Sequence, residues 1–148
     1  MSGIAGCFGT TIADEIVFQM LEKMNHRGPD GYHIMKGKGF TVGCCQLEAG
    51  PKRTSACIGN TEAALVFDGL VFNEKDTHTP DTEVLWKLYQ NGKRSCFKDI
   101  DGAFALAIAR EEELLLARDH VGANPLFYGM HNDTIYFSSE CKSLTGVV

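Results

Sequence analysis

Cysteine and histidine side chains are the groups in this chain that could bind a metal or form a disulfide. The five histidines show no spacing typical of metal ligands. Cys44 and Cys45 are adjacent in a predicted strand, where neighbouring side chains point to opposite faces and are poorly placed to bind one metal. We therefore expect no metal and no cofactor, with most cysteines acting as small core residues. The six cysteines are Cys7, Cys44, Cys45, Cys57, Cys96 and Cys141.

Composition narrows the class of protein. The N-terminus has neither the basic region nor the apolar core of a signal peptide, and no apolar stretch approaches the ~20 residues of a membrane span. We expect a soluble, cytoplasmic chain with reduced thiols. The formal net charge is −5 and no basic run is present, so nucleic acid is not an expected partner. With 148 residues, 44% of them hydrophobic, we predict a single domain over residues 1–148.

Apolar periodicity predicts the elements that would position any site. The first helix starts at a capping box over residues 11–14 and ends at His26-Arg27-Gly28-Pro29. The second begins at Thr79-Pro80-Asp81 and stops at Gly92. Asp68-Gly69 is expected at a strand end, and Pro51-Lys52-Arg53 in a loop. Strands are predicted over residues 3–9, 40–47, 63–67, 103–109, 114–117, 125–128 and 134–138.

The strand over residues 103–109 is apolar on both faces. Phe104, Leu106 and Ile108 alternate with alanines at 103, 105, 107 and 109. Such a strand is covered on both sides, with large side chains filling one layer and alanines allowing close approach on the other. The segregated strands and helices favour an α+β fold, with antiparallel sheets packed together and helices outside.

An ordered set of motifs resembles the glutaminase domain of asparagine synthetases, which are class II glutamine amidotransferases. The resemblance covers nearly the whole chain and implies the four-layer αββα sandwich of N-terminal nucleophile hydrolases. The motifs are Gly3-Ile4-Ala5-Gly6, His26-Arg27-Gly28-Pro29-Asp30-Gly31, Asp81-Thr82-Glu83-Val84, Asp101-Gly102-Ala103-Phe104-Ala105, Ala117-Arg118-Asp119-His120-Val121-Gly122, Pro125-Leu126-Phe127-Tyr128-Gly129, and the segment from Ile135 to Leu144.

The resemblance implies an N-terminal nucleophile at position 2. The family removes the initiator Met, so that a Cys thiol attacks the glutamine amide while the free α-amine takes up the proton. This chain has Ser2 there. A serine hydroxyl is far less acidic than a thiol, and its activation would rest on the α-amine. We expect Met1 to be removed before Ser2; if it stays, residue 2 has no free amine.

The family's oxyanion hole combines an Asn side chain with a Gly backbone N–H, and the matching positions here are Asp68 and Gly69. An ionised Asp68 only accepts hydrogen bonds and places negative charge where negative charge must develop. Losing one oxyanion donor typically costs about 10²–10³ in rate. The Gly69 N–H is retained.

The substrate-binding positions implied by the resemblance are also altered. Gln46 replaces the Arg that binds the substrate α-carboxylate, and a neutral amide cannot form that bidentate, charge-assisted pair. Leu70 replaces a Glu, whereas Asp81 matches the acidic residue that receives the substrate α-amine. The connection between Asn73 and Asp81 is shorter than in the family.

Each of these residues also has a structural interpretation. Ser2 would be an unimportant start-site residue, Asp68 a bend at a strand end, and Asp81 an acid favoured by a helix N-terminus. Arg118 and Asp119 are expected to form a structural ion pair or turn. The segment His26-Arg27-Gly28-Pro29-Asp30 is likewise expected to be structural.

Three functional hypotheses remain open. The first is a degenerate glutaminase domain that acts as a binding or regulatory module, with a separate ATP-dependent synthetase chain as partner, because the residues include no Ser-Gly-Gly-x-Asp-Ser phosphate loop. The second is an active N-terminal serine amidohydrolase acting on glutamine or a related, less charged amide. The third is a fragment or engineered form of a synthetase, which the changes beyond Ser2 disfavour. A homodimer is a further expected assembly.

Overall fold

A computed structural model describes residues 2–10, 13–48, 56–73 and 79–148. Within these residues none of the helices is both long enough and apolar enough to cross a bilayer. In chain order the described elements are β1 (Gly3–Gly9), α1 (Asp14–Glu22), η1 (Asn25–Arg27), β2 (Gly31–Gly37), β3 (Phe40–Gln46), β4 (Cys57–Gly59), β5 (Ala63–Val71), α2 (Asp81–Gly92), η2 (Lys93–Asp99), β6 (Gly102–Arg110), β7 (Glu113–Arg118), β8 (Phe127–His131), β9 (Thr134–Ser138) and α3 (Cys141–Leu144).

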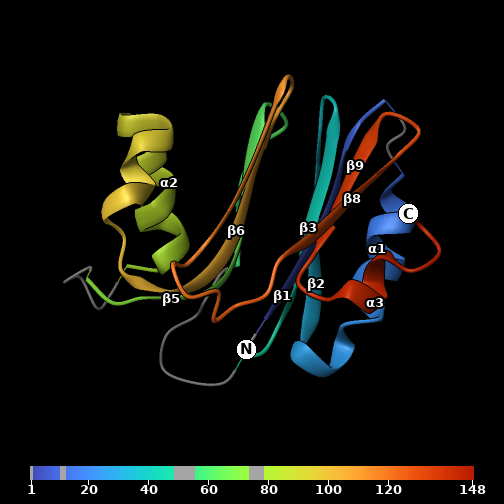
Figure 1. Ribbon diagram of the computed structural model, residues 1–148, viewed down its shortest axis with the longest axis horizontal. Helices are drawn as coiled ribbons and strands as arrows, with labels where there is room; N and C mark the ends of the chain where they lie inside the picture. Colours follow the sequence, from blue (N-terminus) through green and yellow to red (C-terminus); the bar gives the residue numbers. More distant parts are fainter. Residues whose placement is uncertain (1, 11–12, 49–55, 74–78) are drawn as a thin grey trace.

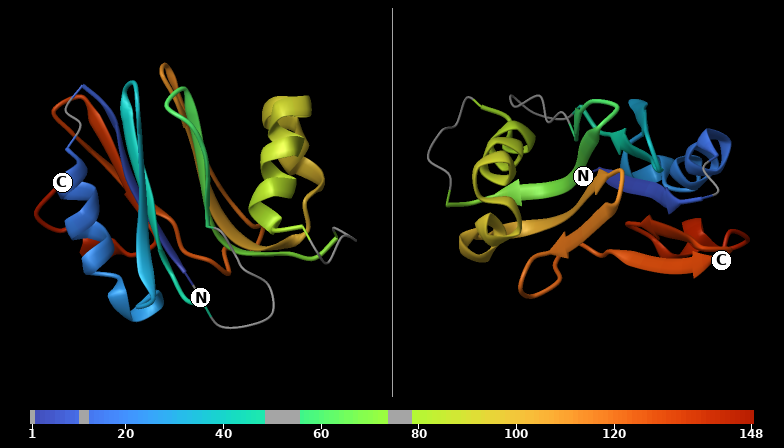
Figure 2. Two further views of the ribbon diagram at one scale, coloured as in Figure 1. Left: turned by 180° about the vertical axis from the view of Figure 1, so that it is seen from behind. Right: turned by 90° about the horizontal axis from the view of Figure 1, so that it is seen from above.

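The strands form two antiparallel sheets packed face to face. One has the order β2-β3-β1-β9-β8 and the other β4-β5-β6-β7. Helices α1 and α3 cover the outer face of the first sheet, and α2 covers the outer face of the second (Figure 1). The views from behind and above show the same four layers (Figure 2). The predicted α+β class and αββα arrangement are therefore confirmed.

Three layers of apolar side chains lie between the four layers of helices and sheets. The layer between the sheets contains Ile4, Phe40 and Phe137 with the alanines of β6. A second layer packs Val17, Met20 and Leu21 of α1 on β1, and a third packs Leu85 and Tyr89 of α2 on β5 and β6. Phe104, Leu106 and Ile108 face α2, while Ala105, Ala107 and Ala109 face the other sheet. The predicted division of β6 into a large-residue face and an alanine face is thus confirmed.

Strand β5 runs further than its sequence pattern indicates. The prediction that Asp68-Gly69 lies at a strand end is wrong, because β5 continues to Val71 and Asp68 pairs with Ala105 of β6. The interpretation of Asp68 as a bend residue is therefore also wrong. The Asp68 carboxylate interrupts the apolar pattern of β5 in the sequence. Inside the strand it accepts hydrogen bonds from Ser2 and Arg27.

Other boundaries also differ from prediction. Helix α1 begins at Asp14 with Ala13 at its N-cap position and no side-chain cap, so the predicted capping box does not start it. Strands β2 and β4 were not predicted, because β2 shows no regular apolar alternation and β4 has only three residues. The loop expected at Pro51-Lys52-Arg53 lies outside the described residues.

Candidate active site

Ser2 and Asp68 meet where the two sheets come together at the start of β1. Ser2 Oγ donates a hydrogen bond of 2.9 Å to Asp68 Oδ1, and Ser2 N lies 3.2 Å from the same oxygen. Ser2 directly precedes β1 of one sheet, whereas Asp68 lies in β5 of the other. The Asp68 side chain is only 1% exposed. The structure therefore brings the candidate nucleophile onto a buried carboxylate.

Arg27 completes this cluster, at the end of the short helix η1. Its Nη2 donates to Asp68 Oδ2 over 2.8 Å, and its Nε donates to the Ser2 carbonyl oxygen over 2.9 Å. The guanidinium therefore compensates a carboxylate that would be very costly to bury alone. Arg27 Nη1 also lies 3.6 Å from Glu140 Oε1. Sequence reasoning placed Arg27 in a structural segment, and its contact with the site is apparent only in three dimensions.

Gly69 and Asn124 support Asp68 from either side. Gly69 has φ of +141°, and a Cβ there would overlap the Ala103 carbonyl oxygen, so the backbone at this point requires glycine. Asn124 Nδ2 donates to the Asp68 carbonyl oxygen over 3.0 Å. Asn124 is a second residue near the site that the sequence did not reveal.

Asp119 holds the loop that carries Asn124. Its carboxylate accepts hydrogen bonds of 2.9–3.2 Å from the backbone N–H groups of Phe104, Val121, Ala123 and Asn124. Burial raises the pKa of Asp119, but these four bonds outweigh that effect and lower the pKa to about 2. The expected turn at this position is therefore built on backbone donors, with Asp119 at its centre.

The three predicted substrate-binding residues form no hydrogen bond with Ser2 within the described part of the chain. Gln46 ends β3 and is half-buried, Leu70 is 52% exposed, and Asp81 starts α2. Asp81 Oδ2 accepts a hydrogen bond of 3.0 Å from the Val71 N–H, which joins α2 to the end of β5. The shortened connection includes residues 74–78, which lie outside the described part of the chain.

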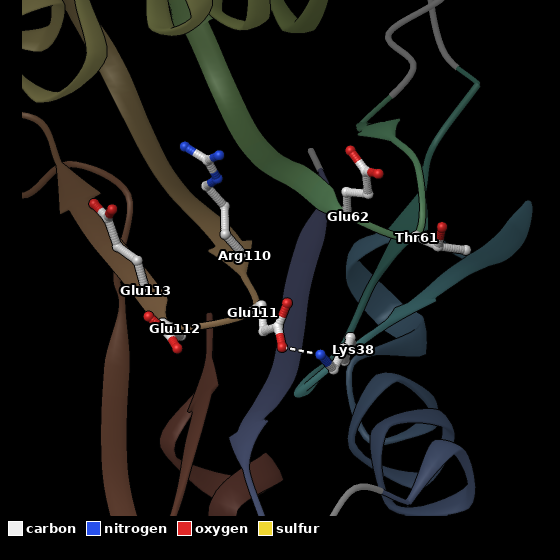
Figure 3. Close-up of a pocket in the computed structure, with 7 residues that line it drawn as sticks. All are labelled: Lys38, Thr61, Glu62, Arg110, Glu111, Glu112 and Glu113. Carbon is white, nitrogen blue, oxygen red and sulfur yellow. Dashed lines mark ion pairs between the residues drawn. The ribbon is translucent and has the colours of Figure 1, made fainter.

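A separate cavity of about 660 Å³ lies at the far end of the molecule, where hairpin turns meet (Figure 3). Its lining includes an ion pair between Lys38 and Glu111. The cavity collects four glutamates against Lys38 and Arg110 and contains none of the predicted site residues. It is therefore distinct from the Ser2 cluster. The lining residues are Lys38, Thr61, Glu62, Arg110, Glu111, Glu112 and Glu113.

Comparisons with known proteins bear on the family of this chain. The glutamine amidotransferase domain family matches residues 1–148. An asparagine synthetase (glutamine-hydrolysing) of Bacillus subtilis is 31% identical over 97% of this chain, and one of Arabidopsis thaliana is 25% identical over 96%. The chain spans only 26% and 28% of those proteins.

Solved structures match the fold. Glutamine phosphoribosylpyrophosphate amidotransferase from B. subtilis superposes with a TM-score of 0.80 at 20% identity, over 98% of this chain and 43% of that one. This likeness agrees with the four layers described above. The chain therefore belongs to the glutamine amidotransferase domain family, and is a class II domain of the type found in asparagine synthetases.

Proposed function

We propose that this domain does not hydrolyse glutamine efficiently and acts instead as a binding or regulatory module. The contact of Asp68 with Ser2 carries the proposal. The Ser2 hydroxyl donates to the carboxylate over 2.9 Å, and the Ser2 nitrogen lies 3.2 Å from the same oxygen. The two groups that an N-terminal nucleophile uses, its hydroxyl and its amine, are thus both engaged by one acidic residue.

This contact removes the general base in either processing state. When Met1 is cleaved off, Ser2 N becomes the α-amine, and a carboxylate at 3.2 Å favours its protonated ammonium form. An ammonium group has no lone pair with which to accept the hydroxyl proton. When Met1 is retained, Ser2 N is an amide nitrogen and is not a base. The weakly acidic Ser2 hydroxyl therefore lacks the activation that it needs.

The oxyanion position is unfavourable for the same reason. Asp68 has no N–H to donate, and Arg27 Nη2 and Nε are already bonded to the Asp68 carboxylate and the Ser2 carbonyl. Losing a single oxyanion donor costs about 10²–10³ in rate. Gln46 and Leu70 supply no cation for a substrate carboxylate, so we expect any bound ligand to be glutamine held weakly or a less charged amide.

A synthetase chain is the partner class that we propose. The relatives are glutamine-hydrolysing asparagine synthetases by name, and this chain matches about a quarter of their length. We propose an ATP-dependent synthetase chain as the partner of the domain on the ground of this similarity. Pull-down with that chain, followed by measurement of its ammonia-dependent rate, tests whether binding is regulatory.

Ammonia release from glutamine tests the loss of activity. We compare the native chain with Ser2→Cys and with Ser2→Cys/Asp68→Asn/Gln46→Arg. We expect no turnover from the native chain, a trace from Ser2→Cys, and a rate about 10²–10³ higher in the triple variant, because an oxyanion donor is restored. Ser2→Cys/Asp99→Asn is the matched control, since Asp99 is a surface residue at the end of η2.

Two outcomes would contradict the proposal. Turnover by the native chain would show an active enzyme, and strong activity of Ser2→Cys alone would show that Asp68 and Gln46 do not disable the site. Intact mass establishes whether residue 1 is removed in each sample. Circular dichroism confirms that the variants are folded.

A serine amidohydrolase is the second candidate, favoured by the 2.9 Å hydrogen bond itself. In that function Asp68, oriented by Arg27, accepts the Ser2 proton during attack on an amide. The native chain would then release ammonia, and Asp68→Asn would abolish the release. The first proposal expects no ammonia from either protein.

A further inference from the structure

Two buried cysteines lie face to face between the sheets. Cys44 in β3 and Cys57 in β4 have sulfur atoms 2.7 Å apart, and the side chains belong to the same inter-sheet layer. Cys44 is 0% and Cys57 3% exposed. Each comes from a different sheet, so a bond between them would join the two halves of the sandwich.

We propose that Cys44 and Cys57 are a modification site, at which hydrogen peroxide forms a reversible disulfide that links the two sheets. A disulfide S–S bond is about 2.05 Å long, so the sulfurs need only a small approach. The described cysteines other than this pair are placed differently. Cys7 and Cys45 lie in the layer under α1, and Cys141 is exposed.

The thiol geometry assigns a role to each sulfur. Cys57 donates its S–H toward Cys44, and burial raises the pKa of Cys57 well above its ordinary value. Cys57 therefore keeps its proton, and we assign the attack on the peroxide to the Cys44 sulfur, which accepts the hydrogen bond. Gln46 Nε2 lies 3.9 Å from the Cys44 sulfur, to which it donates.

The oxidation proceeds in two balanced steps. The Cys44 sulfur attacks one oxygen of hydrogen peroxide and breaks the O–O bond, while the Cys44 thiol proton passes to the departing hydroxide, giving a sulfenic acid and water. The Cys57 thiol then attacks the sulfenic sulfur, forming the S–S bond as the S–O bond breaks and a second water leaves. The two sulfurs are oxidised together by two electrons, and the peroxide is reduced.

Access to the pair comes through β4. This strand has three residues, and among the described strands it pairs with β5 at the edge of its sheet. Short edge strands with few backbone hydrogen bonds open locally at low free-energy cost. The disulfide can form whether or not Ser2 hydrolyses glutamine.

Peptide mapping after oxidation tests the site. The native chain is treated with hydrogen peroxide, alkylated under denaturing conditions and digested. We expect one linked peptide pair containing Cys44 and Cys57, lighter than the free peptides by two hydrogens, and its loss after treatment with dithiothreitol. Recovery of both cysteines as alkylated thiols, or linkage of either to another cysteine, would overturn the proposal.

Variants give a second readout. Oxidation should raise the midpoint of thermal unfolding of the native chain and of Cys45→Ser, whose altered residue lies on the other face of β3. It should leave Cys57→Ser unchanged. The peptide map of the native chain decides the outcome even where a variant is too unstable to purify. A rise in Cys57→Ser equal to that of the native chain would also contradict the assignment.

Discussion

At the scale of single residues, the Arg27–Asp68 pair combines structural and chemical roles. The two side chains are 11% and 1% exposed, with 2.8 Å between Nη2 and Oδ2. The Asp68 carboxylate is shielded from bulk water and Arg27 is mostly buried, so the carboxylate depends on the guanidinium for its counter-charge. Arg27 also donates to the Ser2 carbonyl, so one guanidinium joins the Asp68 carboxylate to the backbone that precedes β1.

Removing Arg27 alone should therefore destabilise the fold. We expect Arg27→Met to lower the free energy of unfolding by about 3–5 kcal/mol, because a buried carboxylate loses its counter-charge. Arg27→Met/Asp68→Asn should recover part of this loss. Denaturant unfolding measures each value. Lys36→Met is the control, because Lys36 and Asp14 form an exposed pair 3.1 Å apart that should contribute about 0–1 kcal/mol. Equal losses in the two single variants would contradict the expected difference.

Asp119 predicts a pH dependence of stability. Its pKa falls from 3.8 in an unperturbed carboxyl to about 2 in the folded chain. The folded state therefore gains stability from ionised Asp119 above pH 3.8, and loses it as the pH falls toward 2. Unfolding measured between neutral pH and pH 2 should show this loss, which is about 2 kcal/mol for this group. Asp119→Asn should be less stable than the native chain at neutral pH, and its free energy of unfolding should not show this loss at low pH. If the native chain and Asp119→Asn lose the same free energy of unfolding as the pH falls, the prediction is wrong.

At the scale of elements, strand β6 sets the spacing of the layers. Ala105, Ala107 and Ala109 face the opposite sheet, where Phe40 and Phe137 fill the layer. Ala107→Leu should force the sheets apart and cost about 1–3 kcal/mol of unfolding free energy. Leu106→Met, on the α2 side of the same strand, should cost less than about 1.5 kcal/mol because volume is conserved. Thermal or denaturant unfolding checks both, and a tolerated Ala107→Leu would mean that the inter-sheet layer is loosely packed.

The sequence predicts best those elements whose pattern is decided by burial. Strand β9 has the predicted bounds, and β6, whose large residues and alanines alternate clearly, exceeds its predicted bounds by one residue at each end. Edge strands β2 and β4 were missed for lack of such a pattern. Ser2 and Asp68 were predicted as altered site residues, but their mutual contact was not. They are 66 residues apart and lie in different sheets, so only the packing of the sheets reveals that they meet with Arg27.

At the scale of the whole molecule, the candidate site depends on both sheets at once. Ser2 is attached to β1 and Asp68 to β5, and each strand is interior to its sheet. The inter-sheet layer contains side chains from both, including Ile4 and Val66. We propose that the chain folds as one domain, since neither sheet can bury its inner face alone.

Cooperative unfolding tests this proposal. Trp86 is the one tryptophan of the sequence and packs in the layer between α2 and its sheet, so its fluorescence reports on that half of the molecule. Far-ultraviolet circular dichroism reports on both halves. In a single cooperative domain, the two signals should change at the same denaturant concentration. A Trp86 transition that precedes or follows the loss of ellipticity would show that the α2 half unfolds separately, and the Ser2–Asp68 contact would then be lost before the rest of the fold.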